Sequence, residues 1–220
     1  MKIFLIITLF ISSFTSFSQS ELDSIMINQI NSLRKNPKSY IPLVEKYIYS
    51  QKKVIRLISN SKVVSISANT GDMDKYNNMV SEKSYSGIDV INIKIKTAEE
   101  LINVLKNTKP LNKLTYNHNM NLITDSHGVF LDSTNTIGHF GPNGERVYQR
   151  FEKTKKIVTE NVIKMSITEY QNKDFSKLIL DLLIDSFIES RGHRKNLLDP
   201  NKKYISVYIS EKVCVQNFGE

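Results

Sequence analysis

The sequence predicts an α+β domain in which helices are layered against a small antiparallel sheet. Residues 22–34, 119–131 and 175–186 carry apolar side chains at helical spacing. Near the C-terminus, alternating apolar residues over 204–210 are followed by a turn and a second apolar stretch, 213–218, a pattern typical of an antiparallel hairpin. Helices first and strands last, with short connections, are typical of a layered α+β domain.

The first 18 residues have the pattern of a secretory signal peptide. Lys2 precedes the apolar run Ile3–Phe10, and small residues stand at Ser16 and Ser18, where a signal peptidase reads the chain. We therefore predict export to the periplasm or the cell exterior, with cleavage near Ser18. The alternative is an uncleaved anchor, but the run is too short for a stable membrane span. No cysteine follows it, which argues against a lipoprotein anchor.

Composition limits the classes of partner. Without Lys2 the mature chain has 29 basic and 22 acidic residues, a formal charge of +7. Such a charge favours anionic surroundings, including phospholipid headgroups, wall polymers and nucleic acid. However, the lysines are scattered and form no basic stripe interleaved with aromatic residues, so we expect a solvated surface and no nucleic-acid partner.

A single cysteine shapes the prediction for the mature chain. About 200 residues suffice for one domain with its own core, so we expect residues 19–220 to fold as one domain without disulfides. Cys214 lies in the predicted strand 213–218 and is expected to be a small buried hydrophobe rather than a catalytic thiol.

The N-terminal half is predicted to contain helices, loops and one strand. Asn36-Pro37 ends the first helix, and a second helix is expected over 39–49. Residues 51–86 are interpreted as loops with local structure. Isoleucines at 91, 93 and 95 alternate with polar residues and predict a one-sided strand. Thr97–Glu100 has the pattern of a capping box that opens another helix.

The C-terminal half carries the chemistry. His127 falls on the apolar face of helix 119–131, where a histidine is more often a hydrogen-bonded core residue than a ligand. A short helix is expected over 147–152. Gly192 is expected to end the helix that runs through residues 175–186, which would place His193 just past a helix end. A helix cap is the simpler interpretation of His193.

Two further segments strengthen a functional interpretation of His193. His139 lies in the glycine-rich loop 136–145, and Glu160 is followed by Asn161 ahead of an apolar residue. Two histidines and a glutamate from three segments are the components of a divalent-metal or acid/base site. Spacing alone does not bring them together.

The order of these segments resembles the CAP superfamily (cysteine-rich secretory proteins, antigen 5, pathogenesis-related 1), in its bacterial SCP-domain form. The matching segments are Leu114–Leu122, Ser126-His127, Gly138–Gly144, Glu160-Asn161, Ser190–Leu198 and Val215–Gly219. The resemblance covers 111–218 and the helix near 22–34. It implies a three-layer α-β-α sandwich with a small antiparallel sheet, and it makes residues 46–109 an insertion between the first helix and the family motifs.

The resemblance also implies a tetrad of two histidines and two acidic residues in an open groove. His139 and Glu160 match the first two members, and His193 matches the second histidine. The second acid falls at Ser190, with Glu189 adjacent but pointing elsewhere on a helix. His127, Ser190 and Asn161 are secondary candidates around this groove.

Three functional hypotheses follow. The first is a secreted CAP domain that binds a small, lipid-like ligand or a cell-envelope component, or holds zinc or another divalent metal on His139 and His193, and that is not expected to be a conventional enzyme. The second is a metal-assisted or acid/base hydrolase of peptides or envelope polymers. In the third, the site is a relic and 46–109 binds a partner. The sequence leaves the ligand and the oligomeric state open.

Overall fold

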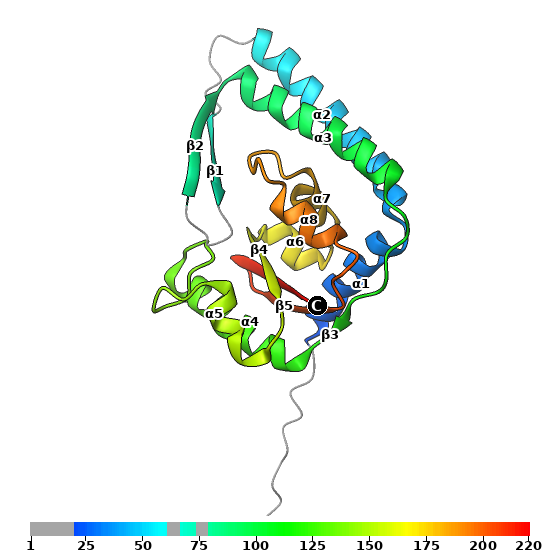
Figure 1. Ribbon diagram of the computed structural model, residues 1–220. Coiled ribbons are helices and arrows are strands. Elements are labelled where there is room, and N and C mark those ends of the chain that lie inside the picture. Colours follow the sequence, from blue (N-terminus) through cyan, green and yellow to red (C-terminus); the bar gives the residue numbers. More distant parts are fainter. Residues whose placement is uncertain (1–19, 61–66, 74–78) are drawn as a thin grey trace, which may run out of the picture.

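Helices alternate with strands along the chain in the computed structural model, which describes residues 20–60, 67–73 and 79–220 (Figure 1). The predicted signal peptide lies outside the described residues. In chain order the elements are α1 Glu21–Lys35, the 3-10 helix Pro37–Tyr40, α2 Ile41–Asn60, β1 Ser67–Met73, β2 Met79–Ser86, α3 Ile88–Asn107, β3 Thr115–Tyr116, α4 His118–Thr134, α5 Val147–Phe151, the 3-10 helix Glu152–Thr154, β4 Val158–Lys164, α6 Ile167–Asn172, α7 Ser176–Ile184, α8 Gly192–Leu198, β5 Tyr204–Ile209 and β6 Val213–Gly219.

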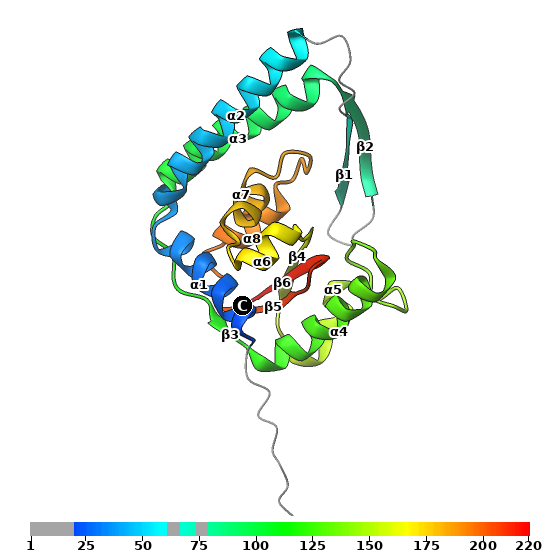
Figure 2. The same ribbon diagram turned by 180° about the vertical axis from the view of Figure 1, so that it is seen from behind.

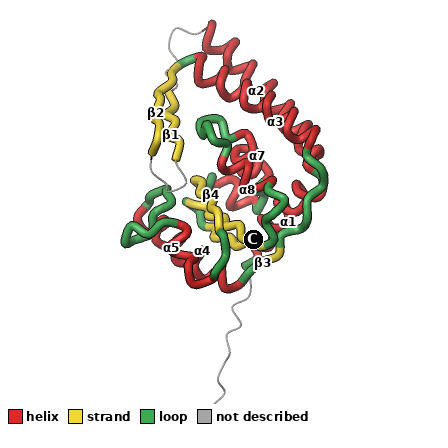
Figure 3. Tube along the Cα trace, in the orientation of Figure 1, coloured by secondary structure: helices red, strands yellow, loops and turns green. Residues whose placement is uncertain are grey.

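Four of the strands form the central sheet, in the order β3-β5-β6-β4. Figure 3 shows the strands in yellow between the helices. The predicted C-terminal hairpin is confirmed, because β5 and β6 pair antiparallel, with Ser206 opposite Asn217. β4 pairs antiparallel with β6. The sheet is mixed rather than wholly antiparallel, since the short β3 pairs with β5 in parallel. β4 is therefore an edge strand.

Helices cover both faces of the sheet, which gives the predicted three-layer α-β-α arrangement (Figures 1 and 2). Adjacent residues of β6 show the two faces, because side chains alternate along a strand. Asn217 hydrogen-bonds Thr124 of α4, whereas Gln216 reaches Met26 of α1 on the other face. α4 packs against β5 and β6, and α8 packs against β4. Gly128 permits the close approach of α4, since a Cβ there would overlap the ring of Tyr208.

The helical predictions outside the insertion hold in most places. The first helix and its end at Asn36 are confirmed, as are α4 and the short α5. Among the described residues, no helix combines the length and apolar character needed to cross a membrane.

The predicted strand at 91–96 is wrong. These residues lie inside α3, which begins at Ile88. The buried positions Ile91, Ala98, Leu101 and Leu105 repeat at helical spacing, so the alternation of isoleucines reflected a broad apolar helix face rather than a strand. Thr97 is not a cap either: its hydroxyl donates to the carbonyl of Ile93, one turn earlier.

The prediction of loops over 51–86 is also wrong in part. α2 continues to Asn60, well past the predicted end, and runs antiparallel beside α3 (Figures 1 and 2). β1 and β2 form a two-stranded antiparallel hairpin of their own. Its sequence is rich in Ser, Asn and Lys, so it lacks the apolar alternation by which a half-buried strand is recognised.

The predicted helix end at Gly192 is wrong as well. α7 ends at Asp185, which adopts the left-handed conformation with φ of 55°. A turn follows, and Gly192 begins α8 instead of ending α7, with Arg191 as the positive-φ residue before it. His193 consequently lies in the first turn of a new helix.

Candidate functional site

Glu160 and Asn161 lie side by side on β4, and their side chains point to opposite faces of the sheet. Glu160 contacts the loop before α5, and Asn161 contacts α8. β4 is an edge strand, with β6 as its one neighbour in the sheet. This strand is the base of the candidate site.

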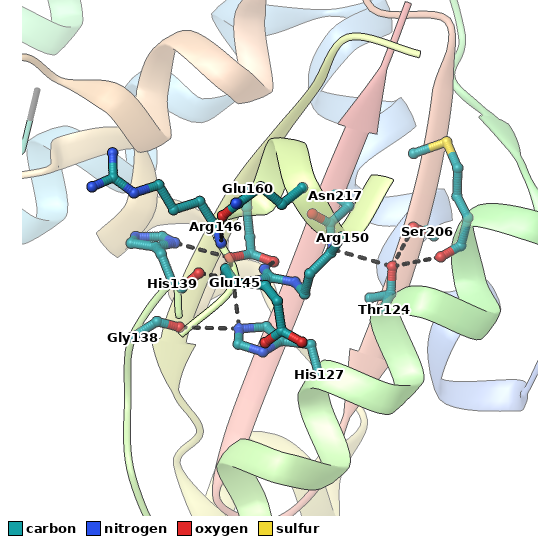
Figure 4. A network of polar contacts seen from close by, with 12 residues as sticks. Thr124, His127, Gly138, His139, Glu145, Arg146, Arg150, Glu160, Ser206 and Asn217 are labelled. Atoms are coloured by element: carbon teal, nitrogen blue, oxygen red, sulfur yellow. Dashed lines mark hydrogen bonds and ion pairs between the residues drawn. The ribbon is translucent and has the colours of Figure 1, made fainter. Parts of the chain in front are cut away.

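His139 is held by the Glu160 carboxylate. Its ring Nδ1 lies 3.0 Å from Glu160 Oε1 (Figure 4). The other oxygen of Glu160 accepts a hydrogen bond of 2.7 Å from Arg150, and Arg150 also donates to the backbone carbonyl of His139 at 2.7 Å. The Glu160 side chain is 1 % exposed, and the His139 side chain 24 %. A buried carboxylate thus orients a ring that remains partly exposed.

The surroundings keep Glu160 ionised. Burial alone would raise the pKa of this carboxyl. The hydrogen bond with His139 and the charge of Arg150, with smaller contributions from His127, outweigh burial and hold the pKa below its ordinary value. The negative charge is therefore present at neutral pH.

His127 lies beneath this network and is fully buried. Its Nε2 is 3.1 Å from the carbonyl oxygen of Gly138 and 3.7 Å from Glu160 Oε1 (Figure 4). Because the carbonyl only accepts, Nε2 donates, and His127 supports the loop one residue before His139. Burial, together with the charges of Arg150 and His139, lowers the pKa of His127 although Glu160 opposes the shift. His127 is therefore a neutral supporting residue.

A second imidazole–carboxylate pair lies at the α7–α8 turn. His193 Nδ1 is 2.8 Å from Asp185 Oδ1, and the His193 backbone N–H donates to Asp185 Oδ2 at 3.0 Å. The Asp185 side chain is 2 % exposed and that of His193 is 20 % exposed. The pair reproduces the arrangement of His139 and Glu160.

Asn161 links the second pair to β4. Its amide nitrogen is 3.4 Å from the His193 carbonyl, and its oxygen accepts from Asn196 at 2.7 Å. Asn196 also donates to the Glu160 carbonyl at 3.3 Å. α8 is therefore fixed to the side chain of Asn161 and to the backbone carbonyl of Glu160, whose side chain holds His139.

A sequence model of the cysteine-rich secretory protein family, CAP, matches residues 99–218. The chain belongs to the CAP family. The matched region includes α4, the loop of His139, β4, α8 and the final hairpin, and thus every residue of the two imidazole–carboxylate pairs. Comparison with curated proteins gives no match.

Two solved structures resemble this CAP chain at low identity. An extracellular protein containing a SCP domain from Bacillus anthracis is 18% identical, with 63% of this chain and 46% of that one covered and a TM-score of 0.39. An outer surface protein from Borrelia burgdorferi is 20% identical, with 59% of this chain and 92% of that one covered and a TM-score of 0.38. The chain thus spans less than half of the Bacillus protein.

Sequence reasoning missed two residues of the candidate site. Arg150 gave no signal beyond being a cation on a short helix. Asp185 is an acid at the end of an apolar helix, shortly before Gly192-His193. That position is the one feature of the sequence that could have marked it as a site residue. Ser190, which stands where the family places its second acid, lies in the turn before α8, and its hydroxyl forms no hydrogen bond among those of the described residues.

The donor set allows only a limited metal site. Glu160 has one oxygen on His139 and the other on the Arg150 guanidinium, so it is not free to coordinate a cation. In both pairs the carboxylate holds Nδ1 and leaves Nε2 available, as in the carboxylate–histidine–metal arrangement. Across the described residues, no group of three or more His, Cys, Asp or Glu side chains is placed to hold a metal. The ring nitrogens outside the two carboxylate contacts are Nε2 of His139 and Nε2 of His193.

Proposed function

We propose that this chain is an exported CAP-domain protein that binds a small ligand through His139 and His193, with a divalent transition metal on their Nε2 atoms. The observation that carries this proposal is the repeated pairing of a partly exposed imidazole with a buried carboxylate at Nδ1. Such pairing fixes the ring and raises its basicity as a ligand. Export rests on the signal-peptide pattern of residues 1–18.

Two imidazoles supply fewer ligands than a closed zinc site, which has four. The remaining positions would be filled by water or by donor atoms of the bound molecule, so we expect an open site that recruits ligands rather than a structural centre. Zinc and copper are the metals that imidazole favours, and magnesium, which prefers oxygen ligands, is not. A lipid-like molecule or cell-envelope component with a polar head is the expected ligand.

Calorimetric titration tests the proposal. The chain lacking residues 1–18 is titrated with zinc, copper and magnesium at neutral pH, beside a His139→Ala/His193→Ala double variant and a His118→Ala control at an exposed position. We expect one zinc or copper ion per chain in the parent and the control, none in the double variant, and no magnesium binding. Absence of zinc and copper binding in the parent would overturn the metal proposal.

The second candidate function is acid/base hydrolysis of peptides or envelope polymers, and Asp185 favours it. A mechanism with two carboxylates appeared incomplete with Ser190 in the second acidic position, yet Asp185 places a buried carboxylate on His193. No Ser, Thr or Cys side chain contacts a ring nitrogen of His139 or His193 within the described residues, so the nucleophile would be water. Turnover of a peptide or envelope polymer that is lost in His139→Gln and His193→Gln, with folding unchanged, would support this candidate. Equal turnover in these variants would exclude it.

A further inference from the structure

The turn between α7 and α8 is built around Asp185. Asp185 and Arg191 are the two positive-φ residues of this turn, with φ of 55° and 54°. Aspartate tolerates the left-handed conformation better than most residues, whereas arginine rarely adopts it. Strained conformations of this kind persist only where the surroundings enforce them.

Hydrogen bonds enforce this turn from inside. Arg191 donates to the carbonyl oxygens of Asp185 and Ile188, and Arg194 donates to those of Leu183 and Ile184. The end of α7 is thereby closed by the side chains that flank His193. The backbone of Asp185 is fixed by the hydrogen bond from Arg191, independently of the bond that its carboxylate makes with the His193 ring.

The carboxylate of Asp185 contacts His193 at two points. Oδ2 accepts the backbone N–H, and Oδ1 faces ring Nδ1. Because both carboxylate oxygens act as acceptors, Nδ1 carries the proton of the neutral ring and Nε2 keeps its lone pair. An isolated neutral histidine side chain has no such constraint, so Asp185 decides which nitrogen His193 presents.

We infer that Asp185 is a positioning residue and the second carboxylate of the site, which fixes His193 as the Nδ1–H tautomer and directs Nε2 outward. It does for His193 what Glu160 does for His139. The family resemblance places the second acid at Ser190, on the turn itself, whereas the carboxylate that contacts His193 comes from the end of α7. This inference rests on the proposed function only for the use of Nε2, not for the tautomer.

Long-range ¹H–¹⁵N spectra of the metal-free chain, labelled at histidine and lacking residues 1–18, test the inference. A His193→Gln variant assigns the His193 signals. We expect the parent at high enough pH for a neutral ring to show His193 as the Nδ1–H tautomer. In Asp185→Asn the side-chain amide can donate to Nδ1, and we expect the Nε2–H form to become populated. Asp181→Asn is the matched control, because Asp181 lies one turn earlier on α7, more exposed, and pairs with Lys177. It should leave the tautomer unchanged.

The His139 signals report whether each variant is folded, since that ring lies on a different pair. An Nε2–H tautomer of His193 in the parent overturns the inference, whether or not Asp185→Asn folds. So does a folded Asp185→Asn variant that retains the Nδ1–H form. Zinc affinity is measured separately, and we expect Asp185→Asn to lower it about 10- to 100-fold. Failure of the parent to bind zinc, with the Nδ1–H tautomer observed, would overturn the proposed function and leave this inference standing.

Discussion

Removal of the Glu160 carboxylate should lower the free energy of unfolding. Its carboxylate is buried and contacts His139 and Arg150 directly. Replacing one member of a buried ionic network leaves the other charge without its partner, and such losses are about 3–5 kcal/mol. The side chain acts through the charge it offers to both neighbours.

We therefore expect Glu160→Gln to lower the free energy of unfolding by about 3–5 kcal/mol. Urea unfolding of the chain lacking residues 1–18 at neutral pH measures this value. Glu152→Gln is the control, since Glu152 is exposed in the 3-10 helix that follows α5. A loss for Glu160→Gln no larger than that for Glu152→Gln would contradict the network drawn in Figure 4.

His127 should give the fold a measurable pH dependence. Its pKa is lowered in the folded state, so the unfolded chain binds the proton first as pH falls through the ordinary value near 6.5. Stability contributed by this ring is present above that value and is lost as pH falls toward the folded pKa. The loss approaches about 1.4 kcal/mol per pH unit while only the unfolded ring is protonated.

Urea unfolding at pH 7.5 and 5.5 measures this effect. We expect the parent and a His118→Gln control, altered at an exposed histidine, to lose stability over this interval, and His127→Gln to lose less. Glu160 does not produce the difference: its folded pKa lies below its ordinary value, so its contribution declines only at lower pH. Equal losses in all three proteins would contradict the assignment of a neutral His127.

At the scale of elements, α3 is tied to the turn that holds His193. Glu100 of α3 pairs with Arg191 and Arg194, the two arginines that flank His193. Arg194, which is buried, also donates to the carbonyl of Thr97 on the same helix. Burial would raise the pKa of Glu100, but the hydrogen bonds and charges of the two arginines hold it below its ordinary value. α3 therefore supports the α7–α8 turn that holds His193.

Glu100→Gln should weaken the contacts of α3 with Arg191 and Arg194. We expect it to lower the free energy of unfolding by about 1 kcal/mol, the upper value for an ion pair that solvent screens, because the Glu100 side chain is 45 % exposed, and to weaken zinc binding several-fold. Glu99→Gln is the matched control, because Glu99, the residue before Glu100, forms an exposed pair with Lys52. Thermal unfolding and zinc titration measure both effects. Equal behaviour of the two variants would show that α3 does not support His193.

Elements with one clear periodicity could be predicted from the sequence, and the others could not. α1 has a single apolar face, and β5 and β6 are two apolar runs separated by a short turn, so their patterns are unambiguous. α3 is apolar over a broad face, which imitates strand alternation over the isoleucines at 91, 93 and 95. The end of α7 was missed because Asp185, not a glycine, takes the positive φ there.

The same limit applies to the site. His139 and His193 stand out through the glycines beside them, whereas Arg150 and Asp185 become partners only once the chain is folded. Local pattern identifies the two partly exposed rings, because the segments around them have distinctive composition. It does not identify the buried charges that orient them, since ionic residues near helix ends are common for other reasons.

At the scale of the molecule, part of the predicted insertion 46–109 belongs to the core. Ala98, Leu101 and Leu105 of α3 are fully buried in the main hydrophobic cluster, together with residues of α1, α7 and the sheet. The match to the CAP family begins at residue 99, within this helix. Deleting 46–109 would therefore remove core side chains, so a test of partner binding is better confined to the β1–β2 hairpin, 67–86.

The chain holds this core together without a disulfide, and Cys214 reports on it. The thiol is fully buried on β6, and burial raises its pKa, so the reactive thiolate is scarce in the folded state. We expect iodoacetamide to modify Cys214 only as fast as the chain unfolds globally, and reducing agent to leave the unfolding temperature unchanged. Labelling followed by mass spectrometry across a urea series measures this, with a Cys214→Ala/Ser133→Cys variant, altered at an exposed position on α4, as the fast-reacting control. Rapid labelling of Cys214 in the folded chain would mean that the β4–β6 side of the core opens locally, and would contradict the expectation that labelling requires global unfolding.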